Sequence, residues 1–102
     1  MKLLMVTSLK EYSDQVAAIF KSAGISVYSA TDTVGFKDGS AHSLMDSWFG
    51  MGEARFDSII IFSFTEDERA QKGLQLVKDF NNQHPGDFPI RVFVLPVEDS
   101  SH

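Results

Sequence analysis

The first third of the chain shows apolar patterns that predict a strand and then an amphipathic helix. Residues 2–8 form an apolar run with extended preference, which predicts a buried strand. Residues 11–23 place apolar side chains on one helical face, and Gly24 follows as a stop signal. The predicted face of this helix consists of Tyr12, Val16, Ile19, Phe20 and Ala23.

The pattern predicts two further strands, with a long interruption between them. One strand runs from about residue 25 to residue 36, and the other covers residues 56–64. The second contains a continuous apolar run at residues 59–62, which is typical of a central position in a sheet.

The last part of the chain predicts a second helix and a final strand at residues 90–97. The helix is predicted to open at Thr65, because Glu68 stands three residues later in the capping-box pattern. Its predicted core face consists of Ala70, Leu74, Val77 and Phe80.

The order of these elements is β-α-β-β-α-β, which predicts a single α+β domain over residues 1–102 with the ferredoxin-like arrangement. Right-handed crossovers place both helices on one face of a four-stranded antiparallel sheet. The other face then presents apolar residues such as Ile60 and Phe62. Exposed apolar patches mark interfaces, so we expect a cyclic oligomer assembled through the helix-free face.

The interruption at residues 37–55 is longer than most connections between strands, and such segments are often functional. It carries glycine breakers together with large apolar side chains, which predicts a mobile loop that contacts a partner. The candidate contact residues are His42, Met45, Trp48, Phe49 and Met51.

Composition narrows the function classes. The formal net charge is −5 and the nine basic residues are scattered, which argues against nucleic-acid binding. No apolar run approaches the ~20 residues of a membrane helix, so membrane insertion is not expected. The chain has no cysteine, which fits a reducing compartment and predicts a cytoplasmic protein.

Catalytic patterns are nearly absent from the sequence. The three histidines, His42, His84 and His102, are far apart and form no metal-ligand spacing. Serine, histidine and carboxylate residues occur, but no G-x-S-x-G context brings them together. We therefore predict no catalytic residue, no metal site and no required cofactor.

Two local motifs carry a family resemblance. Residues 31–36 (TDTVGF) are similar to the T-E-V-x-G-F sequence of the PII signalling proteins. Gly86 and Asp87, followed by residues 92–98 (VFVLPVE), are similar to their G-D-G-K-I-F-V-x-P-V-E sequence. With matching elements between the motifs, the chain resembles the PII and PII-like proteins over nearly its whole length. The resemblance implies a homotrimeric regulator, linked to nitrogen regulation, with residues 37–55 at the position of the T-loop.

The resemblance also implies a partner and a ligand. The T-loop of these proteins contacts enzymes, transporters or channels, so a partner protein such as a membrane transporter is expected. Gly35 and Phe36 would meet Gly86 and Asp87 across a subunit boundary, and this cleft would bind an adenine nucleotide. Lys37 and Arg91 are the cations expected nearby.

One departure from the family pattern changes the expected affinity. Phe88 and Pro89 follow Gly86 and Asp87, so the family's lysine is missing. A triphosphate would keep most of its charge uncompensated. ATP is therefore expected to bind with a dissociation constant on the order of 0.1 mM or weaker, about −5.5 kcal/mol.

Three other protein classes share the predicted order of elements. A dimeric α+β barrel enzyme would carry its catalytic residues on the open sheet face. A CutA-like trimer linked to metal tolerance would need a denser set of metal ligands. An RNA-recognition domain needs stacking aromatics in a basic setting, whereas this acidic chain has three isoleucines in its central strand. Subunit number separates the PII-like protein from the barrel enzyme, since three favours the former and two favours the latter.

Overall fold

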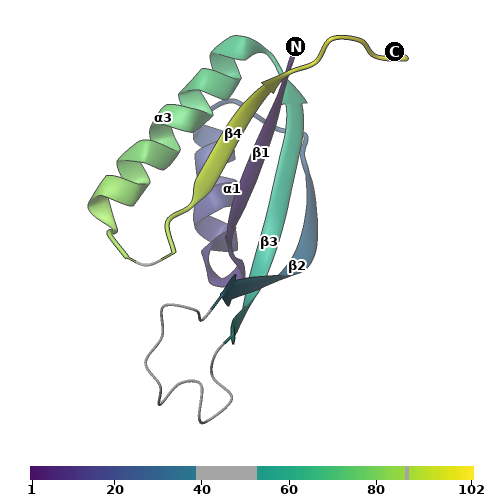
Figure 1. The fold of residues 1–102 in the computed structure, drawn as a ribbon. Helices are drawn as coiled ribbons and strands as arrows, with labels where there is room; N and C mark the ends of the chain where they lie inside the picture. Colours follow the sequence, from purple (N-terminus) through teal and green to yellow (C-terminus); the bar gives the residue numbers. More distant parts are fainter. Residues whose placement is uncertain (39–52, 87) are drawn as a thin grey trace.

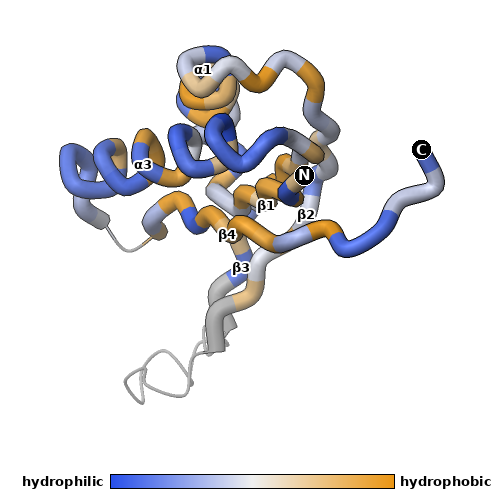
Figure 2. Tube along the Cα trace, turned by 90° about the horizontal axis from the view of Figure 1, so that it is seen from above, coloured by the Kyte–Doolittle hydropathy of each residue, from blue (hydrophilic) through white to orange (hydrophobic). Residues whose placement is uncertain are grey.

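The computed structural model describes residues 1–38, 53–86 and 88–102, and it shows the predicted α+β fold. Four strands form one antiparallel sheet in the order β2-β3-β1-β4. Two helices lie together on one face of this sheet (Figures 1 and 2). The elements are β1 (Lys2–Leu9), a 3₁₀ turn (Lys10–Tyr12), α1 (Ser13–Ser22), β2 (Ser29–Asp38), β3 (Glu53–Thr65), α3 (Asp67–Gln83) and β4 (Arg91–Pro96). The predicted central position of residues 59–62 is confirmed, because β3 lies between β2 and β1.

The core fills the space between the sheet and the two helices. Alternate residues of β1 and β3 point into it, and Phe20 of α1 is its largest fully buried side chain. Burial of such a side chain stabilises the fold by about 1.5–3 kcal/mol. The core residues are Leu4, Val6, Val16, Ile19, Phe20, Ala23, Ile25, Ile59, Ile61, Val77 and Ile90.

Helix α1 ends where the sequence predicts, in a motif that requires glycine. Gly24 has a φ of 79°, a backbone conformation that side chains with a Cβ rarely adopt. The Ile25 N–H donates to the carbonyl of Phe20 at 2.9 Å, and the Gly24 N–H donates to that of Lys21 at 3.1 Å. These bonds form a Schellman motif. Because they hold Ile25 against the helix, the next strand begins at Ser29 and not at the predicted residue 25.

The predicted start of the second helix is wrong. Thr65 is the last residue of β3 and pairs with Lys2 across the sheet, so its backbone is extended. Helix α3 begins at Asp67, and its N-cap residue Glu66 makes no side-chain capping hydrogen bond. The pairing of Thr65 in the sheet thus overrides the local capping-box pattern.

The predicted core face of α3 needs one correction. Ala70 and Val77 are buried, as expected, and Phe80 packs partly buried against the core. Leu74 is only half-buried, and Gly73 takes the buried position beside it. A Cβ on Gly73 would lie 3.2 Å from the Leu4 side chain, so the helix packs on β1 through this small residue.

Strands β2 and β3 extend further than the sequence predicts. Lys37 pairs with Ala54 and Asp38 pairs with Glu53, so both strands enter the segment 37–55 that was expected to be a loop. The remainder, residues 39–52, lies outside the described residues. This also applies to all the candidate contact residues, which are His42, Met45, Trp48, Phe49 and Met51.

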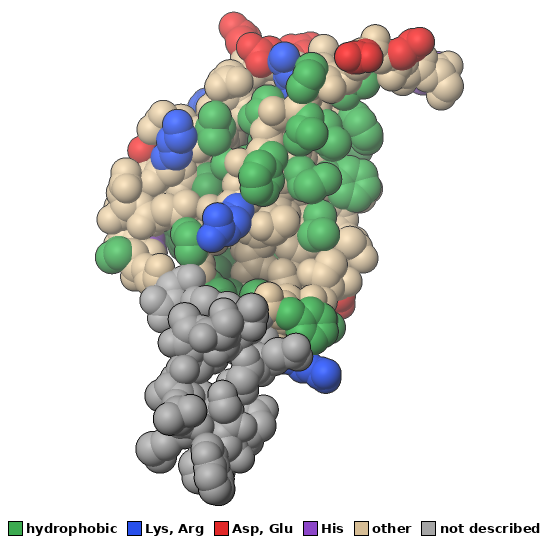
Figure 3. All heavy atoms as spheres, viewed as in Figure 1, with side chains coloured by type: hydrophobic (Ala, Val, Ile, Leu, Met, Phe, Trp, Pro, Cys, Tyr) green, Lys and Arg blue, Asp and Glu red, His purple; other side chains and the backbone are tan. Residues whose placement is uncertain are grey.

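The helix-free face of the sheet is apolar, which confirms the prediction from strand alternation. Leu3 pairs with Phe64 on one side and Leu95 on the other. The exposed fractions of Phe64, Phe93 and Leu95 are 57%, 51% and 41%. Figure 3 shows the hydrophobic side chains gathered over the strands of this face. We call this surface the sheet patch; it consists of Leu3, Met5, Ile60, Phe62, Phe64, Phe93 and Leu95.

Asn81 holds the chain where it leaves α3 and enters β4, and this generates a prediction. Its Nδ2 donates to the Ile90 carbonyl at 2.8 Å, and its Oδ1 accepts from the Ile90 N–H at 3.0 Å. Because Ile90 is buried, Asn81→Ala leaves both backbone groups without partners and should cost about 2 kcal/mol. Urea denaturation measures the loss, with the exposed Asn82→Ala as control. Equal stability of the two variants would contradict the assigned role.

Candidate functional site

A hollow lies where the β2–β3 ribbon continues beyond the rest of the sheet. The pairing of β1 with β3 ends at Leu9 and Ser58, whereas β2 and β3 remain paired to Asp38 and Glu53 (Figure 1). The hollow has a volume of about 330 Å³, and we call it the Arg91 hollow. It is lined by Thr7, Ser8, Leu9, Gly35, Phe36, Phe56, Ser58, Phe88, Pro89 and Arg91.

The wall of the hollow is built around the ring of Phe56. Phe56 pairs directly with Gly35 across β2 and β3, and its ring lies against the glycine so closely that a Cβ there would collide with it. The ring also contacts Phe88, with 4.8 Å between ring centroids and an interplanar angle of 60°. An aromatic ring that covers a glycine on the opposite strand restores side-chain packing at that position.

The floor of the hollow is polar. The Ser58 hydroxyl donates to the Ser8 carbonyl at 3.0 Å, and the Ser8 hydroxyl donates to the Leu9 carbonyl at 3.0 Å. Both serines are buried, so these bonds satisfy their donors and leave oxygen lone pairs. Arg91 pairs with Thr7 at the edge of the hollow and is exposed. Among the described lining residues, Arg91 alone carries a charge.

The structure brings three of the six candidate ligand residues to this hollow. Gly35, Phe36 and Arg91 line it together within one chain, and the meeting of Gly35 and Phe36 with Gly86 and Asp87 across a subunit boundary stays a prediction. Gly86 is exposed, and no atom lies within 4 Å of where its Cβ would be. The side chain of Lys37 and all of Asp87 lie outside the described part of the structure.

The surroundings of Gly35 explain why a glycine stands at this position. In the structure it lies inside β2, and among the described glycines only Gly24 has a positive φ. The close approach at Gly35 is made by the ring of Phe56.

Phe56 was not recognised as a site residue from the sequence, and Phe88 was noted only as a departure from the family motif. Phe56 can be recognised only when the register of β2 and β3 is known, because that register places its ring opposite Gly35. Strand alternation alone does not give that register.

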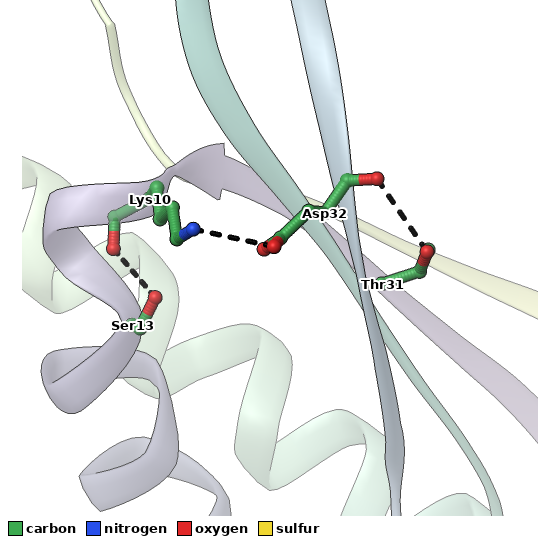
Figure 4. Close-up of polar contacts among 4 residues, drawn as sticks. All are labelled: Lys10, Ser13, Thr31 and Asp32. Carbon is green, nitrogen blue, oxygen red and sulfur yellow. Dashed lines mark hydrogen bonds and ion pairs between the residues drawn. The ribbon is translucent and has the colours of Figure 1, made fainter.

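A second hollow, of about 500 Å³, shares three residues with the first, namely Leu9, Phe56 and Phe88. Its other lining residues are Lys10, Glu11 and Asp57, so we call it the acidic hollow. The Lys10 ammonium lies 3.2 Å from the carboxylate of Asp32 on β2, as Figure 4 shows. Both side chains of this ion pair are more than half exposed, so it adds little stability.

The described residues contain neither a cluster of metal ligands nor a membrane-spanning helix. No three His, Cys, Asp or Glu side chains among residues 1–38, 53–86 and 88–102 meet in a way that could hold a metal ion. Neither described helix is long and apolar enough to cross a membrane.

Comparison with known proteins identifies the fold. No protein-family model matches the sequence, and no curated protein matches it. A PII-like signalling protein from Thermus thermophilus superposes with a TM-score of 0.63 at 18% identity, over 91% of this chain and 82% of its own. The chain has the PII-like fold. CPII, a nitrogen regulatory PII-like protein from Thiomonas intermedia bound to ADP, AMP and bicarbonate, gives 0.62 at 15% identity, over 97% and 93% of the two chains. The family resemblance predicted from the two motifs is thus confirmed at the level of the PII-like fold.

The contact between Gly35 and Phe56 generates a second prediction. Gly35→Ala places a methyl group against the ring of Phe56, and the displacement of this ring should lower the free energy of unfolding by about 1–3 kcal/mol. Gly86→Ala is the matched control, because its methyl group enters open space and should leave the stability unchanged.

The double variant Gly35→Ala/Phe56→Ala makes this test specific. Removing the ring removes the collision, so the double variant should be less destabilised than the sum of the two single changes. Urea denaturation of all three variants gives the coupling energy. Simple additivity would show that the ring is not what excludes a side chain at position 35.

Proposed function

We propose that this protein is a non-catalytic, PII-like regulatory protein of the cytoplasm that works as a homotrimer. Its segment 37–55 contacts a partner protein, for which a membrane transporter is our candidate, and its Arg91 hollow binds a small ligand. The observation that carries the proposal is the sheet patch, a wide apolar surface on a PII-like fold that needs a cover. The likeness to CPII favours a role in nitrogen regulation.

The sheet patch supports an assembly in which each copy covers this face of another. Phe64 and Phe93 expose more than half of their surface in the single chain, and the patch continues across β3, β1 and β4. Burial of apolar area contributes about 25 cal/mol per Å², so shielding several aromatic rings at once favours association. A cyclic trimer places the three patches around one axis.

The same face supports a regulatory role in preference to the dimeric barrel enzyme. Such an enzyme would carry its acid, base or nucleophile on the helix-free face. Among the described side chains that the strand register places on this face, Arg91 alone is charged. Serine and threonine hydroxyls are present there, but the strand register places no described carboxylate or histidine on the same face to act as a base.

The Arg91 hollow supports binding of a small anion. A guanidinium group can hold a carboxylate or phosphate through paired hydrogen bonds, and the rings of Phe36, Phe56 and Phe88 give the hollow an apolar wall. CPII, which has the same fold, binds ADP, AMP and bicarbonate, and all three are anions. We propose ligands of this kind for the present chain.

Trimer formation is tested by charging the sheet patch. Phe93→Asp buries a carboxylate without a partner in the interface, which costs several kcal/mol per site and should convert the trimer to monomer. Val27→Asp is the matched control, because Val27 is 80% exposed and lies outside the sheet patch. Light scattering at micromolar concentration gives the molar mass, and hence the subunit number, of both variants. A native protein that is a stable monomer would refute the trimer, and a stable dimer would favour the barrel enzyme.

The role of segment 37–55 is tested by deleting residues 40–52 and joining the ends with a short glycine linker. If this segment serves partner contact, the deletion should leave the trimer intact and shift the unfolding temperature by less than about 4 °C, which corresponds to roughly 1 kcal/mol. Binding to the transporter should be lost. A deletion variant that still binds would place the partner surface elsewhere.

A further inference from the structure

The paired rings of Phe56 and Phe88 separate the Arg91 hollow from the acidic hollow. Both residues line both hollows, and their ring centroids are only 4.8 Å apart, so the rings are in direct contact. We infer that this ring pair sets the length of the ligand: it admits one anionic group beside Arg91 and keeps out the rest of a polyphosphate chain. The inference rests on the ligand role proposed above for the Arg91 hollow.

The ring pair is held in place from several sides. The ring of Phe56 has the backbone of Gly35 against it, with no space for even a methyl group between them. Phe88 is half-buried, and the chain just after it is fixed by the two hydrogen bonds between Asn81 and Ile90. Because the ring of Phe56 has no free space on the side of Gly35, it cannot move in that direction without disturbing packed structure.

Charge adds a second barrier behind the rings. Around the Arg91 hollow the one described charge is positive. The charged residues that line the acidic hollow are Lys10, Glu11 and Asp57, and the Lys10 ammonium is paired with Asp32, which is not part of the lining. The lining thus carries one positive charge and two negative charges. A second or third phosphate that passed the rings would enter an environment of its own sign.

These features define the ligand class as a compact anion with a single carboxylate or phosphate group. AMP and ATP are suitable probes because they share the adenosine group and differ only in two phosphates. In the native protein ATP should bind no more tightly than AMP, within a factor of two. A general phosphate site would favour the more highly charged nucleotide.

Phe88→Ala tests the partition directly. Opening it lets the phosphates of ATP reach the acidic hollow, but the carboxylates there repel them, so the affinity for ATP should rise less than threefold in this variant alone. The affinity for AMP should also change less than threefold, as measured by calorimetry at fixed salt concentration. Phe88→Leu, which keeps an apolar side chain but loses the ring, serves as the second variant and should behave in the same way. Val27→Ala, which truncates an exposed side chain that lines neither hollow, should change neither affinity.

Asp57→Asn provides a signature that simple loosening of the protein would not give. With the rings in place, Asp57 lies behind the partition, so the substitution should change the affinity for ATP less than twofold. In the Phe88→Ala protein the same substitution should raise it at least fivefold, since the phosphates then reach the acidic hollow. The effects of the two substitutions on ATP affinity should therefore not be additive, as expected when a barrier separates two sites.

The outcomes separate this inference from the proposed ligand role. Native protein that binds ATP at least tenfold more tightly than AMP, or a Phe88→Ala/Asp57→Asn protein with no gain for ATP over Phe88→Ala, would overturn the partition and leave the Arg91 hollow as a ligand site. Failure of the native protein to bind either nucleotide would overturn the proposed ligand role, and the partition with it. Loss of AMP binding in Arg91→Ala would support the position of the anionic group.

Discussion

The antiparallel pairing of β1 with β3 is the constraint on which the rest of the structure depends. Both strands carry apolar side chains on both faces, and the register that sets Val6 opposite Ile61 also sets Met5 opposite Phe62. A shift of one residue would exchange the two faces and take the hydroxyls of Ser58 and Ser63 away from the carbonyls of Ser8 and Val27 to which they donate. One pairing therefore fixes both the core beneath the helices and the sheet patch on the other side.

A sheet with two apolar faces needs two covers, and the described residues provide only one. Helices α1 and α3 bury the face that contains Leu4, Val6, Ile59 and Ile61, with Gly73 allowing α3 to approach β1 closely. The opposite face retains half-exposed aromatic rings, and apolar surfaces of this kind are typical of interfaces. The core residues and the residues of the sheet patch alternate along the same strands.

The fold was predictable from the sequence because its signals are local and repeated. Helical spacing in α1, the stop at Gly24 and the apolar run of β3 each predict an element without knowledge of the others, and their order gives the topology. The errors lie at the ends of elements. Thr65 begins a capping-box sequence, but it pairs with Lys2 in the sheet. Ile25 was predicted to begin a strand, but its N–H donates to the Phe20 carbonyl at the end of α1. Tertiary contacts decide such boundaries, and a sequence pattern does not contain them.

The candidate site was less predictable, since it depends on strand lengths and on one cross-strand pair. Strand β3 has 13 residues and β1 has 8, so the β2–β3 ribbon extends beyond β1 and leaves a space beside it. Phe56 and Phe88 come from distant parts of the chain and occupy much of that space, and Gly35 gives the first ring its room. What remains open beside Arg91 has a volume of about 330 Å³ and is shaped by side chains that no contiguous motif connects. Gly35 and Phe36 of the first glycine motif line this space, whereas Gly86 of the second does not, and the contact between the rings of Phe56 and Phe88 depends on residues that neither motif contains.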